Sequence, residues 1–271
     1  MIRRNKVITK IIKNHPTGDH PFSVSLLSTD GNTSSGVAHR SLVDNGHNDV
    51  LLEYMVPALQ EHHISPEALK RHQDLIASFK IANLPTLRSP YPQNLTTQKG
   101  NFAEIFLAEY LSTTTETQLP IYRLRYNPNP DQSMKGDDVL LFDLDSDPVQ
   151  IIVGESKFRG TPDKQAVIDI VDGLVRSNKA GLPVSLMFVS ERLFQENKPE
   201  LGKKVQNCAV LFATNKLHIE YVGLLMSNHN AKNPVNQHTS NALHNLLMIS
   251  LGIHDPETIV KQAFNRLEGN I

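Results

Sequence analysis

The sequence predicts an α/β fold in which a mixed β-sheet is covered by helices. In the second half of the chain, segments with helical spacing of apolar residues alternate with short apolar runs that are typical of strands. Their order is a helix, a strand meander, another helix and further strands, which is the order of an α/β domain. Hydrophobic residues at 39% and charged residues at 20% indicate an ordinary globular protein.

The first part of the chain predicts short strands followed by two helices. Residues 1–46 mix short apolar runs with clusters of Gly, Ser, Asn and Asp, which indicates strands and turns. Helices are expected over Asn48–His62 and Pro66–Ala82. Ser65 fits the N-cap of the second helix, and Pro66 fits its first position. The region is therefore expected to be α+β.

A breaker-rich stretch over Leu84–Lys99, which contains three prolines, is the best candidate for a boundary. It divides the chain into an N-terminal accessory or partner-binding region, residues 1–90, and a second domain, residues 91–271. In that domain apolar periodicity predicts helices over 101–112 and 163–178, strands over 121–126, 139–144, 149–155, 184–189 and 218–225, a polar loop over 228–237, and two C-terminal helices over 239–251 and 257–267.

Composition excludes several classes of protein. The formal net charge of -1 provides no global basic field, so any contact with nucleic acid must come from local patches. The single cysteine, Cys208, excludes an internal disulfide and a Cys-based zinc cluster, which favours a reducing, cytoplasmic location. No apolar run approaches the roughly 18 residues of a membrane span. There is no P-loop, and His62 and His63 lack metal-binding spacing and are expected to be packing or surface residues.

The residues that suggest chemistry lie on the predicted hairpin. Asp138 opens one apolar run, and Glu155 and Lys157 close the next. Because side chains alternate along a strand, Glu155 and Lys157 are expected on the same face. Asp138 and Glu155 could supply carboxylate oxygens to Mg²⁺, which binds through few protein ligands. Lys157 could hold or deprotonate a water and neutralise the transition state.

A non-catalytic interpretation of the same residues is that they are surface charges. Glu-x-Lys triplets are common on exposed sheets, where cross-strand ion pairs contribute little. The position of Glu155 favours the catalytic interpretation, because it directly follows the apolar residues 151–153. A carboxylate at the end of such a run is expected to be partly buried and to need a cation.

Three stretches resemble the PD-(D/E)xK nuclease superfamily, and together the resemblance covers about residues 95–225. They are Lys99-Gly100-Asn101-Phe102-Ala103-Glu104, Lys135-Gly136-Asp137-Asp138 and Gly154-Glu155-Ser156-Lys157-Phe158. Within the superfamily their sequences look most like those of the HamA family, the effector nucleases of the Hachiman antiphage defence system.

The resemblance implies a restriction-endonuclease-like core and a Mg²⁺-dependent DNA endonuclease, with Mn²⁺ as a possible substitute. It implies that Asp138, Glu155 and Glu104 bind the metal and that Lys157 is catalytic. It further implies a helicase partner that restrains the nuclease until infection or DNA damage. Flanking basic residues could follow DNA phosphates without reading sequence; the candidates are Arg159, Lys164, Arg176 and Lys179.

Two choices between residues stay open at this point. Asp137 stands where the superfamily has a proline, although Asp138 is preferred because it adjoins the apolar strand. On the helix, periodicity does not choose between Glu104 and Glu109, and only the resemblance favours Glu104.

The leading hypothesis for function is therefore a DNA endonuclease. One alternative is a non-catalytic DNA-binding or protein-interaction subunit that keeps a degenerate nuclease fold. Another is a structure-specific or sequence-specific nuclease, such as a junction resolvase or a restriction subunit, because residue types at a metal site do not determine substrate choice.

Overall fold

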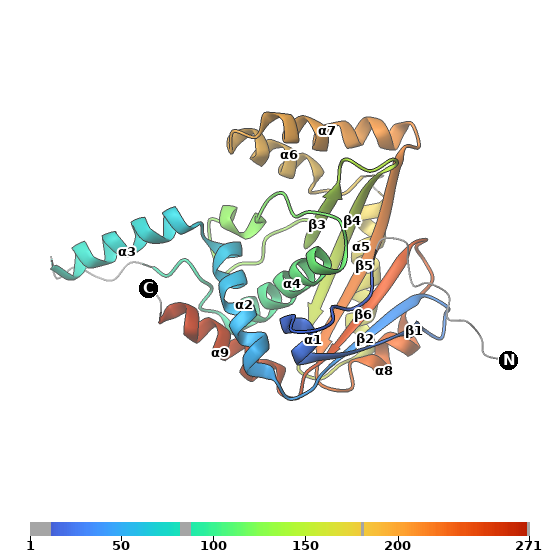
Figure 1. The fold of residues 1–271 in the computed structure, drawn as a ribbon, viewed down its shortest axis with the longest axis horizontal. Coiled ribbons are helices and arrows are strands. Elements are labelled where there is room, and N and C mark those ends of the chain that lie inside the picture. Colours follow the sequence, from blue (N-terminus) through green and yellow to red (C-terminus); the bar gives the residue numbers. More distant parts are fainter. Residues whose placement is uncertain (1–11, 82–87, 180–181, 270–271) are drawn as a thin grey trace.

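A six-stranded mixed sheet forms the centre of the computed structural model, which describes residues 12–81, 88–179 and 182–269. The strand order is β1-β2-β6-β5-β4-β3 (Figure 1). The predicted α/β fold, a mixed sheet flanked by helices, is confirmed. The strands are β1 (Leu26–Asn32), β2 (Ala38–Asp44), β3 (Val139–Asp143), β4 (Val149–Phe158), β5 (Leu217–Ser227) and β6 (Leu246–Gly252).

The four inner strands are parallel to one another, and the two edge strands are antiparallel to their neighbours. Helices cover both faces, so the inner strands are buried on both sides. All seven residues of β6 are buried. Within the described ranges the α-helices are α1 (Pro21–Ser25), α2 (Asn48–His63), α3 (Pro66–Ile81), α4 (Leu95–Thr114), α5 (Lys164–Lys179), α6 (Leu186–Gln195), α7 (Pro199–Ala213), α8 (Lys232–His238) and α9 (Pro256–Glu268), and η1 (Arg123–Tyr126) is a 3₁₀ helix.

Two apolar cores lie on the two faces of the sheet. One core joins α2, α4 and α9 to the sheet, and the other joins α5, α6, α7 and α8 to it. α4 is the central helix of the first core, with eleven buried residues among its twenty. Figure 1 shows α3 extending away from this body and the α6–α7 pair beyond one end of the sheet. Among the described residues, no helix is both long and apolar enough for a bilayer span.

The N-terminal strands are part of the same sheet as the rest of the chain. β2 pairs in parallel with β6, from Ala38 opposite Leu247 to Val43 opposite Gly252. α2 packs against α4 and α9 in the first core. Residues before and after position 90 therefore build one sheet and share one core. The partner-binding role of residues 1–90 stays a prediction.

Several predicted elements are confirmed with small shifts in their ends. α2, α3, α5, α9, β3, β4 and β5 follow the expected segments. α4 begins at Leu95 rather than residue 101, because the Asn94 side chain accepts a hydrogen bond from the Thr96 amide and caps the helix. The end of the stretch expected as a boundary, residues 95–99 of 84–99, therefore belongs to α4. Residues 82–87 lie outside the described part of the chain.

Three expected elements and one expected loop differ from the structure. The strand expected over 121–126 is wrong, since residues 123–126 form η1, in which Leu124 is buried. The strand expected over 184–189 is wrong as well. That segment leads into α6, and its buried residues Leu186, Val189 and Leu193 follow helical spacing.

The third difference concerns the C-terminal part. The helix expected over 239–251 is wrong, because most of its apolar run forms strand β6. A fully buried strand shows a continuous apolar run, which periodicity alone does not distinguish from a buried helix. The polar loop expected over 228–237 contains most of helix α8.

Candidate active site

The strand register brings the predicted hairpin residues together. Val139 pairs with Gly154 across the antiparallel β3–β4 ladder, so Asp138, directly before β3, comes next to Glu155 near the end of β4. Glu104 approaches from α4, which packs on the same two strands. The three acids and Lys157 therefore come from three separate segments of the chain.

A cavity of about 660 Å³ lies where these segments meet. Glu104, Asp138 and Lys157 all line it. Glu155 does not line it, because its carboxyl group lies against α5 and accepts a hydrogen bond of 2.5 Å from Lys157 Nζ. A Cβ at Gly173 of α5 would come within 2.9 Å of that carboxyl carbon, so glycine there gives Glu155 its space.

Arg123 of η1 is the principal residue that the sequence analysis missed. Its Nε and Nη2 donate to the two oxygens of Glu104 at 2.6 and 2.9 Å. Its Nη2 also lies 3.6 Å from Asp138. The apolar pattern predicts a strand here, and η1 is a single short turn with Leu124 buried, so no local spacing indicates the contact of Arg123 with Glu104.

The two adjacent aspartates have different surroundings. Asp137 is buried, and its two oxygens accept hydrogen bonds from Ser177 Oγ at 2.7 Å and the Ser185 amide at 2.9 Å. Asp138 lines the cavity, and one of its oxygens accepts from the amide and hydroxyl of Ser156 at 2.8 and 3.0 Å. Its other oxygen is free of such bonds among the described residues, apart from the 3.6 Å approach of Arg123. This geometry favours Asp138 as the cavity aspartate.

Gly136 makes this arrangement possible. Its φ of +120° lies in a region that favours glycine, and an added Cβ would come within 2.6 Å of Ser185 Oγ. The same hydroxyl accepts a hydrogen bond from the Asp137 amide at 2.9 Å. The turn before β3 is therefore anchored to the segment that precedes α6.

The two candidate glutamates of α4 also have different positions relative to the cavity. Glu104 lines the cavity, whereas Glu109 is bonded to His62 Nε2 at 2.8 Å and to the Tyr54 hydroxyl at 3.2 Å. Glu109 therefore belongs to the contact between α2 and α4. Position relative to the cavity favours Glu104.

Burial and neighbouring charge change the acidity of the site. Burial, with a contribution from the charge of Asp138, raises the pKa of Glu104 to about 7 against the opposing effect of Arg123. Burial, followed by the charge of Asp138, raises the pKa of Glu155 to about 7, and Lys157 acts in the opposite direction. Carboxyl groups with such raised pKa values in a cavity gain from a nearby cation.

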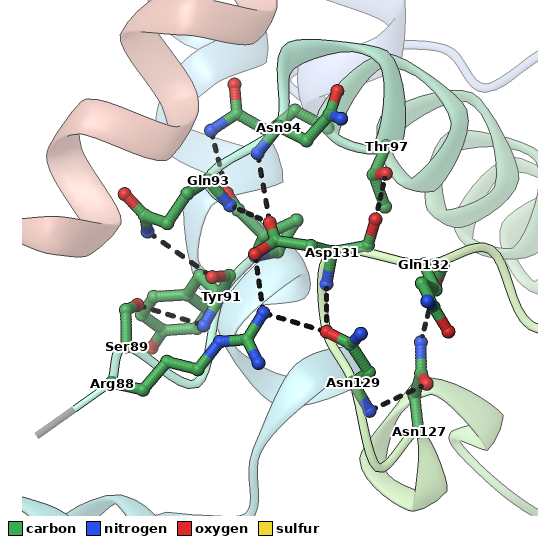
Figure 2. A network of polar contacts seen from close by, with 12 residues as sticks. Arg88, Ser89, Tyr91, Gln93, Asn94, Thr97, Asn127, Asn129, Asp131 and Gln132 are labelled. Carbon is green, nitrogen blue, oxygen red and sulfur yellow. Dashed lines mark hydrogen bonds and ion pairs between the residues drawn. The ribbon is translucent and has the colours of Figure 1, made fainter.

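One wall of the cavity is a polar loop held against the start of α4. Figure 2 shows Asp131 at its centre, accepting hydrogen bonds from the Gln93 and Asn94 amides at 2.6 and 3.0 Å. Arg88 donates to the same carboxylate at 2.6 Å, and the Thr97 hydroxyl donates to the Asp131 carbonyl at 2.9 Å. The loop continues to Gln132, Ser133 and Met134, which also line the cavity.

Basic residues lie on the cavity wall as well. Arg159 lines it, and so does Lys99, which pairs with Glu257 at 2.5 Å. Lys164 and Arg176 are not among the lining residues. The side chain of Lys179 lies outside the described part of the structure.

The donor set suits a hard divalent cation. Carboxylate oxygens are the ligands that Mg²⁺ prefers, and Glu104 and Asp138 present them to the cavity. Within the described ranges, no three His, Cys, Asp or Glu side chains already converge as a metal-binding group. Glu104 is instead paired with Arg123, and Glu155 is paired with Lys157.

Comparison with known proteins gives the family. The HamA family model matches residues 20–267 of the chain. The chain belongs to the HamA family. The Hachiman protein HamA of Bacillus cereus is 35% identical over 268 residues, which covers 96% of this chain and 97% of that protein. The match of the HamA family model therefore includes every described element from α1 to β6 and most of α9.

Proposed function

We propose that this HamA-family chain is a Mg²⁺-dependent DNA endonuclease, the effector of a Hachiman antiphage defence system. The observation that carries the proposal is that Glu104, Asp138 and Lys157, from three separate segments, line one cavity. These are residues that the resemblance to PD-(D/E)xK nucleases selects. Glu155, the remaining residue of that set, is bonded to Lys157 beside the cavity.

Each side chain has a role in this proposal. Asp138 and Glu104 would hold Mg²⁺, with Glu155 as a further carboxylate. When bound, the ion would stabilise charge on a phosphodiester and lower the pKa of a coordinated water. The Lys157 ammonium, positioned by Glu155, would donate to that water or to a phosphate oxygen. Arg159 and Lys99 would contact flanking phosphates.

Membership of the HamA family also supports a partner. We propose that a helicase partner restrains the nuclease and that infection or DNA damage releases it. An unrestrained nonspecific nuclease would damage the DNA of its own host, so restraint is physically reasonable. The cytoplasmic location expected from the single cysteine is part of the same proposal.

Plasmid cleavage tests the enzymatic part. The purified chain is incubated with plasmid DNA in Mg²⁺ or EDTA, and wild type is compared with Lys157→Ala. Lys216→Ala is the matched control, since Lys216 is an exposed lysine that does not line the cavity. We expect Mg²⁺-dependent cleavage that falls by at least about 100-fold in Lys157→Ala and is unchanged in the control. Cleavage that persists in EDTA, or in Lys157→Ala, contradicts the proposal.

One observation favours the alternative of a non-catalytic DNA-binding or protein-interaction subunit. Both glutamates of the site are already paired with basic side chains of the chain itself. A degenerate nuclease fold would keep such ion pairs as structural contacts. In that case the protein would bind DNA or a partner with no cleavage in Mg²⁺, and Lys157→Ala would have no catalytic effect.

A further inference from the structure

We propose that Arg123 competes with a divalent cation for Glu104 and thereby limits how tightly the site binds metal. This inference rests on the proposed function, because it concerns the same cavity and the same carboxylates. It gives Arg123 a regulatory role that the motif residues do not supply.

The first support is the geometry of the ion pair. The Arg123 guanidinium donates through Nε and Nη2 to both oxygens of Glu104, at 2.6 and 2.9 Å. The side chains are 13% and 10% exposed, so water screens the pair little. A bidentate, charge-assisted contact of this kind is among the stronger ones in proteins. It engages both oxygens of the carboxylate that a metal ion would use.

The second support is the position of the charge. Arg123 Nη2 lies 3.6 Å from Asp138, the other carboxylate that faces the cavity. A cation held by Glu104 and Asp138 would therefore sit close to a guanidinium of the same sign. Repulsion at such a distance is large in a partly buried site. Metal binding must weaken at least one of the contacts that Arg123 makes.

The third support is that Arg123 has another hydrogen-bond acceptor within reach besides Glu104. Its Nη2 also approaches the Met134 carbonyl at 3.4 Å, and both Arg123 and Met134 line the cavity. Arg40 makes a similar bidentate contact with Asp30, a more exposed residue, but neither Arg40 nor Asp30 lines the cavity. Arg123 is thus distinguished from a purely structural arginine by its access to the proposed metal position.

Direct measurement of metal binding tests this role independently of cleavage. Free Mn²⁺ is counted by electron paramagnetic resonance during titration of wild type, Arg123→Gln and Arg123→Lys. We expect Arg123→Gln to tighten Mn²⁺ binding by about tenfold or more, because a positive charge is removed beside the site. Arg123→Lys keeps the charge but loses the planar fork, so its gain is expected to be smaller.

Two further variants isolate the effect. Arg125→Gln is the matched control, since Arg125 lies on the same 3₁₀ helix but binds the Glu61 carbonyl and does not line the cavity. It should leave Mn²⁺ affinity unchanged. In a Glu104→Gln background the Arg123→Gln gain should shrink, because the competition for Glu104 is lost and only the repulsion near Asp138 is left to relieve.

A second measurement uses the wild-type protein and needs no folded Arg123→Gln variant. The ¹⁵N–¹H resonance of Arg123 Nε, assigned from its loss in Arg123→Lys, is followed as Mg²⁺ is added. Since Nε donates to Glu104, we expect this resonance to shift as metal binds, while that of Arg125 stays in place.

The outcomes separate the inference from the proposed function. Mn²⁺ binding that is equal or weaker in Arg123→Gln, with an Arg123 resonance that Mg²⁺ does not move, overturns the competition and leaves a metal-dependent nuclease intact. Binding only in Arg123→Gln supports strong competition. No binding in any variant removes the metal site, and both proposals fail together.

Discussion

Asp137 and Asp138 are neighbours in sequence but differ in what surrounds their carboxylates. Asp137 has both oxygens bonded inside the protein, to Ser177 and to the Ser185 amide. Asp138 faces the cavity and adds negative charge next to Glu104 and Glu155. Asp137 therefore stabilises the fold, and Asp138 lies where the proposed chemistry needs a carboxylate.

This difference predicts opposite effects on stability. Asp137→Ala should lower the free energy of unfolding by about 2–4 kcal/mol, because it leaves the Ser177 hydroxyl and Ser185 amide unpaired in a buried place. Asp138→Ala should change it by less than about 1 kcal/mol, since water in the cavity can reach Ser156 and the repulsion with the two glutamates is relieved. Urea denaturation measures both. A larger loss in Asp138→Ala than in Asp137→Ala would reverse the assignment.

At this scale the sequence predicted the acids better than their partners. Asp138, Glu155 and Lys157 follow from an apolar strand pattern with charged ends, and the structure places them next to one another. Arg123 could not be predicted in the same way. Its contact with Glu104 joins residues nineteen positions apart on two helices, and no local spacing encodes it.

Among the elements, the contact between α2 and α4 depends on a buried neutral histidine. His63 Nδ1 contacts the Leu59 carbonyl at 2.7 Å, so Nδ1 must carry the proton. Nε2 then accepts from the Asn101 amide group at 2.9 Å. Burial, opposed by the bond to Leu59, lowers the pKa of His63 to about 4. Of the two roles expected for this histidine, packing or surface, its 7% exposure indicates packing.

The pKa of His63 predicts how stability depends on pH. The folded-state value lies below the unfolded value of about 6.5, so the unfolded state takes up the proton first as the pH falls. The stability contributed by neutral His63 is therefore full above about pH 6.5 and is lost progressively toward pH 4. The free-energy cost of His63→Asn, measured by denaturation, should shrink by up to about 3 kcal/mol across that window. A cost that is constant with pH would contradict this account of His63.

Elements were predicted where the apolar period was clear. α5 and α9 show helical stripes, and the β3–β4 hairpin shows two apolar runs of strand length with charged ends; the structure has these elements close to the expected ends. Errors came from apolar runs whose period is ambiguous. β6 is buried on both faces and shows no alternation, while α6 begins in an apolar segment with Val184 and Met187 exposed.

In the whole molecule, the two halves of the chain meet in one sheet. β2, from the first fifty residues, pairs with β6, near the C-terminus, and α4 lies between α2 and the sheet in one core. The family match runs through both halves, over residues 20–267. The cavity lies at the ends of β3 and β4 under α4, so its geometry depends on a core to which α2 and α9 also contribute. Such pairings over long sequence separations are not encoded in local periodicity.

The most direct test of the central claim is the position of a metal ion in the folded protein. Crystals soaked in Mn²⁺ would be examined by anomalous scattering. The account predicts a peak in the cavity within about 2.2 Å of carboxylate oxygens of Asp138 and Glu104, with the Arg123 guanidinium displaced from at least one oxygen of Glu104. Mn²⁺ bound only away from Asp138, or absent from the cavity at saturating concentration, would contradict it.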